Sequence, residues 1–186
     1  MRAISLTKNY KCTECKAVFI KERLTQKICL EEACAVAVAK KNKVKREKVA
    51  RKETKVKLEA LQPKSYYTGK AQIAVNAFIR ARDAGNPCIS CGRHHQGAWH
   101  AGHYRSTGAA PELRFEELNI HLQCAPCNTH LSGNIVNYRP RLIEKIGLQG
   151  VDWVEGKHAA KNYTKDDLRE IEATYKAKLK TLQIKS

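Results

Sequence analysis

The chain has little of what a large hydrophobic core requires. Only 6% of its 186 residues are aromatic, whereas 28% are charged, so we expect small packed modules rather than one large core. No apolar run approaches the roughly 18 residues needed to cross a bilayer, and residues 1–5 lack the apolar stretch of a secretory signal. The sequence therefore predicts a soluble, cytoplasmic protein with no membrane partner.

Acidic residues are scarce relative to basic ones. The 18 Asp and Glu residues face 35 Lys and Arg residues, which gives a formal charge of +17. An excess of this size indicates a polyanionic partner, and nucleic acid is the default one. A scaffold that binds only other proteins would leave this charge without a purpose.

Cysteine is the residue type that the chain has in a regular pattern. Two groups of four are separated by a long cysteine-free stretch: Cys12, Cys15, Cys29 and Cys34, then Cys88, Cys91, Cys124 and Cys127. Paired cysteines in a reducing compartment favour metal ligation over disulfides. Four thiolates complete a tetrahedral Zn²⁺ site with no open position, so we expect two structural zinc ions.

The segments between and after these groups favour helices and one strand. Residues 31–61 contain neither Gly nor Pro, and residues 40–57 carry ten basic side chains against two acidic ones; this segment is either a solvated, disordered connector or a helix that follows phosphates. Apolar spacing predicts helices over 71–82 and 164–182, the second with a stripe suited to a core or to a partner helix. Alternation predicts a strand over 119–123, with Asn119, His121 and Gln123 on one face.

These patterns define an α+β protein with four segments. Residues 1–34 form an N-terminal zinc module and residues 35–62 a basic helical linker. Residues 63–150 contain the second cysteine group, and residues 151–186 contain the C-terminal amphipathic helix.

The interval between the two halves of the second cysteine group is rich in histidine. It contains the segment WHAGHYRS at residues 99–106, and the second cysteine pair runs directly into Asn128. A hairpin joining the two cysteine pairs would bring His103 and Asn128 into one neighbourhood. The order of cysteine pair, histidine, Asn119, cysteine pair and Asn128 resembles the HNH, or ββα-metal, nucleases. It is most similar to the NinG (Rap) family of recombination nucleases from lambdoid phages.

The resemblance implies a zinc-braced, treble-clef-like ββα-metal core flanked by long helices. It implies an Mg²⁺- or Mn²⁺-dependent endonuclease that cuts branched double-stranded DNA, such as Holliday junctions and D-loops, in the host cell cytoplasm. His103 matches the general base, Asn128 a ligand of the catalytic metal, and Asn119 the residue that orients the catalytic loop. Gly102 stands where an acidic ligand is usual, so His100 and His121 become the candidates for a second ligand.

A non-enzymatic zinc-finger DNA-binding protein is the alternative. It accounts for the cysteines and the charge equally well, but it does not account for the recurrence of four polar residues at nuclease spacing: His100, His103, Asn119 and Asn128. Resolving a junction takes two symmetric cuts, so the nuclease interpretation predicts a homodimer, with either long helix, 31–61 or 164–182, as its interface.

Overall fold

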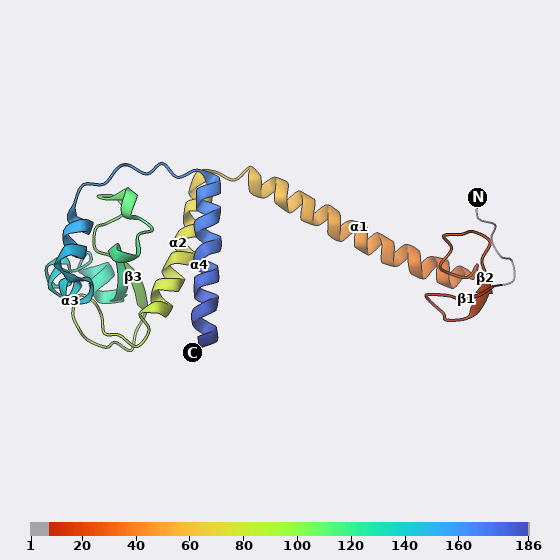
Figure 1. Cartoon of the computed structure of the whole chain (residues 1–186), viewed down its shortest axis with the longest axis horizontal. Coiled ribbons are helices and arrows are strands. Elements are labelled where there is room, and N and C mark those ends of the chain that lie inside the picture. Colours follow the sequence, from red (N-terminus) through yellow and green to blue (C-terminus); the bar gives the residue numbers. More distant parts are fainter. Residues whose placement is uncertain (1–7, 186) are drawn as a thin grey trace. The chain divides into compact units, whose positions relative to one another are not determined.

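The computed structural model describes residues 8–185, which divide into two compact units between Gln62 and Pro63. Residues 1–7 lie outside the described part. They include residues 1–5, on which the expectation of no secretory signal rests. Figure 1 shows the elements of each unit. Within residues 8–185, no helix is both long and apolar enough to cross a bilayer.

The first unit combines a small hairpin with one long helix. Strand β1 (Asn9–Lys11) pairs antiparallel with β2 (Val18–Ile20), and helix α1 covers Glu32–Ala60. Of the two interpretations left open for residues 31–61, a disordered connector and a helix, the structure has the helix. Cys34 lies in the first turn of α1 and is its only buried residue, so the first cysteine group and the basic helix form one unit rather than separate segments divided after residue 34.

The second unit is built on two helices that run side by side, α2 (Lys64–Arg82) and α4 (Lys165–Lys185). Val75 and Ile79 of α2 share a core with Leu168 and Tyr175 of α4. The apolar stripe of α4 thus packs within its own chain, which is one of the two roles that its spacing predicted. Because this burial orders the chain from Tyr67 onward, α2 begins seven residues before the expected start at residue 71.

The start of α4 is fixed by a reciprocal capping box. The backbone N–H of Thr164 donates to the Asp167 carboxylate at 2.7 Å, and the backbone N–H of Asp167 donates to Thr164 Oγ1 at 3.1 Å. This exchange satisfies amide groups that the first helical turn leaves without partners.

A second hairpin lies between the helices. Strand β3 (Trp99–His103) pairs antiparallel with β4 (Ile120–Cys124), so that His100 lies opposite Gln123 and His103 lies opposite Ile120. One face of the hairpin contributes Ala101 and Ile120 to the core formed with α2. The other face carries His121 and Gln123, as alternation predicted.

Asn119 precedes β4 instead of opening it, which corrects the expected strand start. It ends the short 3-10 helix η2 (Glu117–Asn119), which follows another, η1 (Pro111–Leu113). Its backbone N–H is taken by the Glu116 carbonyl at 3.1 Å, so the chain completes a turn at Asn119 before the strand ladder begins.

Helix α3 (Ile135–Glu155) was not expected from the sequence. Pro140 lies inside it, and Gly147 interrupts its backbone with a φ of 77°; these two residues hide the helical period. Tyr138, Leu142 and Val151 are buried along α3, and the boundary expected between residues 150 and 151 falls within it.

A buried carboxylate ties α2, β4 and α3 together. Asp83 is 2% exposed and pairs with Arg82 at 2.8 Å and with Lys145 of α3 at 2.9 Å. It also accepts the backbone N–H of Leu122 in β4 at 3.1 Å. Although burial opposes ionisation, the two cations and their hydrogen bonds lower the pKa of Asp83 to about 2. The hairpin is therefore held in a fixed position between the helices.

Candidate functional site

The second cysteine group gathers at one end of the hairpin. Cys88 and Cys91 come from the loop after α2, Cys124 ends β4, and Cys127 lies in the single π-helical turn η3 (Pro126–His130). Their four Sγ atoms lie within 4.8 Å of one another, with Cys91 and Cys124 4.0 Å apart. A disulfide needs about 2.05 Å between its sulfurs, whereas four thiolates around Zn²⁺ lie about 3.8 Å apart. The spacing fits zinc.

The first cysteine group has the same geometry in the first unit. Cys12 Sγ lies 3.8 Å from Cys34 Sγ, and Cys15 Sγ lies 3.7 Å from Cys29 Sγ. All four sulfurs again lie within 4.8 Å of one another. Both groups can therefore hold a zinc ion, as their sequence spacing predicts.

Two of the candidate residues meet beside the second group. Asn128 follows Cys127 in η3, and its amide Nδ2 donates to His100 Nδ1 at 2.9 Å. The bond fixes the orientation of the amide, and Asn128 Oδ1 makes no hydrogen bond with any described residue. This oxygen is a ligand of the type that Mg²⁺ or Mn²⁺ takes. Because His100 holds the other end of the amide, it orients Asn128.

His103 occupies a different position on the same strand. It is the last residue of β3 and lies on the face opposite to His100. Its Nε2 is 2.9 Å from the carbonyl oxygen of Arg114. Since a carbonyl only accepts, Nε2 carries the proton, and the neutral ring leaves Nδ1 with a lone pair. Burial lowers the pKa of His103 below 6.5, so the ring is neutral near pH 7 and suited to accept a proton from water.

Asn119 is fully buried and holds the loop that follows β3. Its Oδ1 accepts the backbone N–H of Arg105 at 2.8 Å, and its Nδ2 donates to the carbonyls of Arg105 at 3.0 Å and Leu113 at 3.2 Å. Asn119 therefore fixes the backbone next to Arg114, the residue whose carbonyl holds the His103 ring.

His121, the other candidate for a second metal ligand, is engaged elsewhere. It is 2% exposed, and its Nδ1 donates to the Tyr138 hydroxyl at 3.2 Å. That hydroxyl donates in turn to the carbonyl of Gly102 at 3.2 Å. Burial lowers the pKa of His121 to about 3, so the ring stays neutral and supports the strand beside His103. Tyr138 lies on the unpredicted helix α3, and nothing in the sequence pattern identified it.

The structure gives a reason for glycine at position 102. A Cβ atom there would overlap Oε1 of Gln123, which is fully buried. The Gln123 amide is held by donating from Nε2 to Ser90 Oγ and to the Gly133 carbonyl, both at 2.6 Å. The space that an acidic side chain at 102 would occupy is therefore filled by Gln123, whose packing could not be read from the sequence.

Comparison with known proteins identifies the family. The chain matches the family described as Bacteriophage Lambda NinG protein over residues 4–185. It belongs to the NinG family. It is 53% identical over 129 residues to Protein ninG of Salmonella phage P22 and 52% identical over 129 residues to Protein ninG of Escherichia phage lambda.

These alignments cover 69% of this NinG-family chain, and they cover 64% of the P22 protein and 63% of the lambda protein. The match therefore spans somewhat less than two thirds of each relative. No solved structure matches the chain. The names of these relatives state no reaction, so any reaction must be argued from the site.

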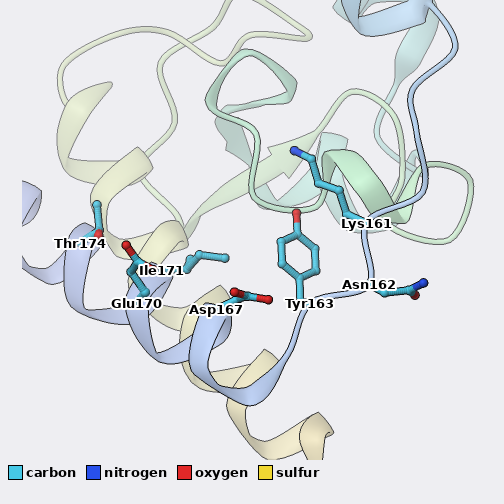
Figure 2. A pocket seen from close by; sticks show the side chains of 7 residues that line it. All are labelled: Lys161, Asn162, Tyr163, Asp167, Glu170, Ile171 and Thr174. Atoms are coloured by element: carbon cyan, nitrogen blue, oxygen red, sulfur yellow. The ribbon is translucent and has the colours of Figure 1, made fainter.

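A separate hollow of about 470 Å³ lies where the linker before α4 meets that helix. Figure 2 shows Lys161, Asn162 and Tyr163 on the linker and Asp167 on the first turn of α4. Asp167 is already used in the helix cap, and the Tyr163 hydroxyl donates to the Glu112 carbonyl at 3.4 Å. The hollow includes none of the candidate site residues described above.

Proposed function

We propose that the protein is a metal-dependent endonuclease that cuts branched DNA and uses an HNH-like, zinc-braced site. The observation that carries the proposal is the hydrogen bond between His100 and Asn128. It lies beside the second cysteine group, on strand β3, and the same strand ends in His103. A protein that only binds DNA has no need for an oriented amide oxygen and a neutral histidine at the ends of one zinc-braced hairpin.

Each side chain has a defined role in the proposed reaction. Asn128 Oδ1 would hold an Mg²⁺ or Mn²⁺ ion, which keeps several water ligands and so needs few protein groups. When bound, such an ion stabilises negative charge on the phosphoryl and leaving oxygens. His103 Nδ1 accepts the proton of the attacking water, and the Arg114 carbonyl holds the ring in the tautomer that leaves Nδ1 free. The family resemblance implies 5′-phosphate and 3′-hydroxyl products.

The substrate is proposed from charge and from the family resemblance. The formal charge of +17 stays strongly positive when eight thiolates bind two Zn²⁺ ions. Four thiolates and one Zn²⁺ ion together carry a charge of about −2, so each site lowers the total only slightly. Lysine-rich α1 and the second unit offer phosphate contacts, which supply affinity independent of base sequence. Branch selectivity rests on the resemblance to recombination nucleases, which act on phage DNA in the host cytoplasm.

One observation keeps the DNA-binding alternative in view. No hydrogen bond among the described residues joins His103 to His100 or Asn128, and the strand register places His103 on the opposite face. The nuclease proposal requires the scissile phosphate to reach both Asn128, which is bonded to His100 near the start of β3, and His103 at the end of the strand on the opposite face. A DNA-binding protein would place no such demand on this strand.

A homodimer is part of the proposal because two symmetric cuts resolve a junction. The apolar face of α4 is covered by α2. Of the two helices considered for the interface, α1 therefore remains, because in its own unit it buries only Cys34, in the cysteine cluster. Light scattering of the protein at micromolar concentration, alone and with junction DNA, should give two chains per particle after the mass of any bound DNA is subtracted. One chain per particle in both conditions contradicts the dimer.

The decisive experiment incubates the zinc-loaded protein with a labelled four-way junction and a linear duplex of matched sequence. We expect incision of the junction with Mg²⁺ and none with EDTA. His103→Ala and Asn128→Ala should each abolish incision with junction affinity nearly unchanged, because phosphate contacts come mainly from Lys and Arg. His158→Ala, at a partly exposed histidine whose Nε2 lies 2.8 Å from the Trp153 carbonyl oxygen, is the control and should cut normally. Tight binding without incision by the wild type under any divalent ion would establish the DNA-binding alternative.

A further inference from the structure

An apolar protrusion follows the candidate metal ligand directly. We use this name for the side chains of Leu131, Ile135 and Val136, which are 57%, 39% and 85% exposed. Single exposed apolar residues are ordinary on protein surfaces. Three of them lie within six residues of the sequence, beginning three positions after Asn128, and this concentration of exposed apolar side chains is less usual.

The turn that carries the protrusion is strained and firmly held. Ser132, Gly133 and Asn134 all adopt left-handed backbone conformations, with φ of 49°, 90° and 47°. Each non-glycine residue in this region costs on the order of 1 kcal/mol. The backbone N–H of Gly133 donates to the Cys127 carbonyl at 3.0 Å, and the Gly133 carbonyl accepts from Gln123 at 2.6 Å. The zinc-binding segment therefore fixes a turn that points apolar side chains into solvent.

Unpaired cations lie next to the protrusion. Asn137, the residue after Val136, lines a hollow of about 420 Å³ together with Arg93 and Arg141. Neither guanidinium forms a hydrogen bond or ion pair with a described residue. Arg141 rests against Gly92, where any Cβ would displace it. With Glu144 as the one carboxylate lining this hollow, the two guanidinium groups favour an anionic group over an apolar partner. In a chain of formal charge +17, we take that group to be a nucleic-acid phosphate.

We infer that the apolar protrusion packs against bases left unstacked at a DNA branch point while Arg93 and Arg141 bind a neighbouring phosphate. The inference rests on the proposed function and names the element that recognises the branch. Apolar side chains that enter a continuous duplex must first separate stacked bases, at a cost of a few kcal/mol per step. At a branch this stacking is already broken, so the protrusion would favour branched over linear DNA.

The test uses the whole 186-residue, zinc-loaded chain without Mg²⁺ and a junction with 2-aminopurine at the branch point, whose fluorescence changes when the contacts of the base change. We expect the wild type to change this fluorescence on binding, and the double variant Leu131→Ser/Val136→Ser to lower the ratio of junction to linear-duplex affinity at least about tenfold, to lose the fluorescence change, and to keep linear-duplex affinity. The control Ile73→Ser alters a residue of α2 that is 70% exposed and should behave as wild type. Unchanged zinc content and thermal unfolding check the fold of both variants.

Three outcomes would overturn the inference. A double variant that keeps the wild-type affinity ratio and fluorescence change removes the protrusion from branch recognition, while the nuclease proposal stands on its own incision assay. An equal loss of junction and linear affinity makes the protrusion a general DNA contact. A wild type that does not prefer the junction over the linear duplex removes branch selectivity from the proposed function as well.

Discussion

The three histidines of the second hairpin differ in their surroundings more than in their sequence positions. His100 accepts a hydrogen bond from an amide, His103 donates to a backbone carbonyl, and His121 is buried against Tyr138. The atom that each ring leaves free, and not its place in a motif, sets what it can do. His103 keeps a lone pair at the end of the strand and is neutral near pH 7, which is the state that a general base requires.

The lowered pKa of His103 predicts the pH dependence of incision. Burial favours the neutral ring, so the protein should retain its activity as the pH falls to 6.5, and should lose it only as the pH falls further through the pKa of His103. Single-turnover incision rates between about pH 5 and pH 8 would check this. The profile should rise with pH and level off above its midpoint. A midpoint above 6.5 contradicts the proposed role of His103.

Position 102 offers a test of packing beside the site. Gly102→Ala places a methyl group against Gln123 Oε1 and should lower the free energy of unfolding by about 1–3 kcal/mol. Both tryptophans, Trp99 and Trp153, lie in the second unit, so their fluorescence in a urea titration reports its unfolding. Gly97→Ala, which meets nothing within 4 Å, is the control.

A second variant separates this collision from a general backbone effect. If Gln123 is the obstacle, Gly102→Ala should cost less in a Gln123→Ala background than in the wild type, because the amide is no longer there. Equal costs in the two backgrounds would show that the constraint on position 102 has another origin.

At the scale of elements, the α2–α4 pair supports the hairpin from one side. Leu168 of α4 is 1% exposed within the shared core, so Leu168→Ala should lower the free energy of unfolding of the second unit by about 2–5 kcal/mol. Urea titrations followed by tryptophan fluorescence would measure the loss. Ile184→Ala, at a residue that is 76% exposed, should change it by less than about 0.5 kcal/mol. Similar losses in the two variants would mean that α4 does not pack as described.

The elements that could be predicted from sequence are those specified by local signals. The capping residues Thr164 and Asp167 marked the start of α4, and the absence of Gly and Pro marked α1. Cysteine spacing predicted both clusters because each closely spaced pair supplies two ligands from one short segment, and two such pairs complete a site. Helix α3 was missed because Pro140 and Gly147 interrupt the helical spacing of apolar residues in the sequence. In the structure, packing of its buried residues maintains the helix.

The sequence predicted that His103 and Asn128 would lie together, because the cysteine cluster and the hairpin both had local signals. The structure instead pairs Asn128 with His100 and places His103 on the opposite face of β3. The assignment of His121 to Tyr138 and the filling of the space at Gly102 by Gln123 depend on packing between segments far apart in sequence. No spacing rule encodes such contacts, so the second candidate ligand could not be resolved from sequence.

At the scale of the whole molecule, the two units should depend on separate zinc ions. Cys12→Ser should remove one zinc ion per chain and leave the tryptophan-detected unfolding of the second unit unchanged, since that unit has its own core and cluster. Cys124→Ser should remove the other ion and abolish that transition, because structural zinc contributes about 10–16 kcal/mol, comparable to the whole stability of a domain. Metal analysis and fluorescence on the same samples would decide. A shift of the transition in Cys12→Ser contradicts independence.

Cys34 links the first zinc site to helix α1, because it lies in the first turn of that helix. A helix with one buried residue among 29 gains little from packing, and forming its first turn is the unfavourable step. Metal bound at Cys34 would hold that first turn in place, so the charged helix would persist as a straight rod of about 44 Å. Such a rod exceeds the roughly 34 Å of one duplex turn and could touch backbone in successive turns. Without metal the same lysines would lie on a coil of no fixed length, so in the proposed DNA-binding role zinc would set the length of duplex that α1 can contact.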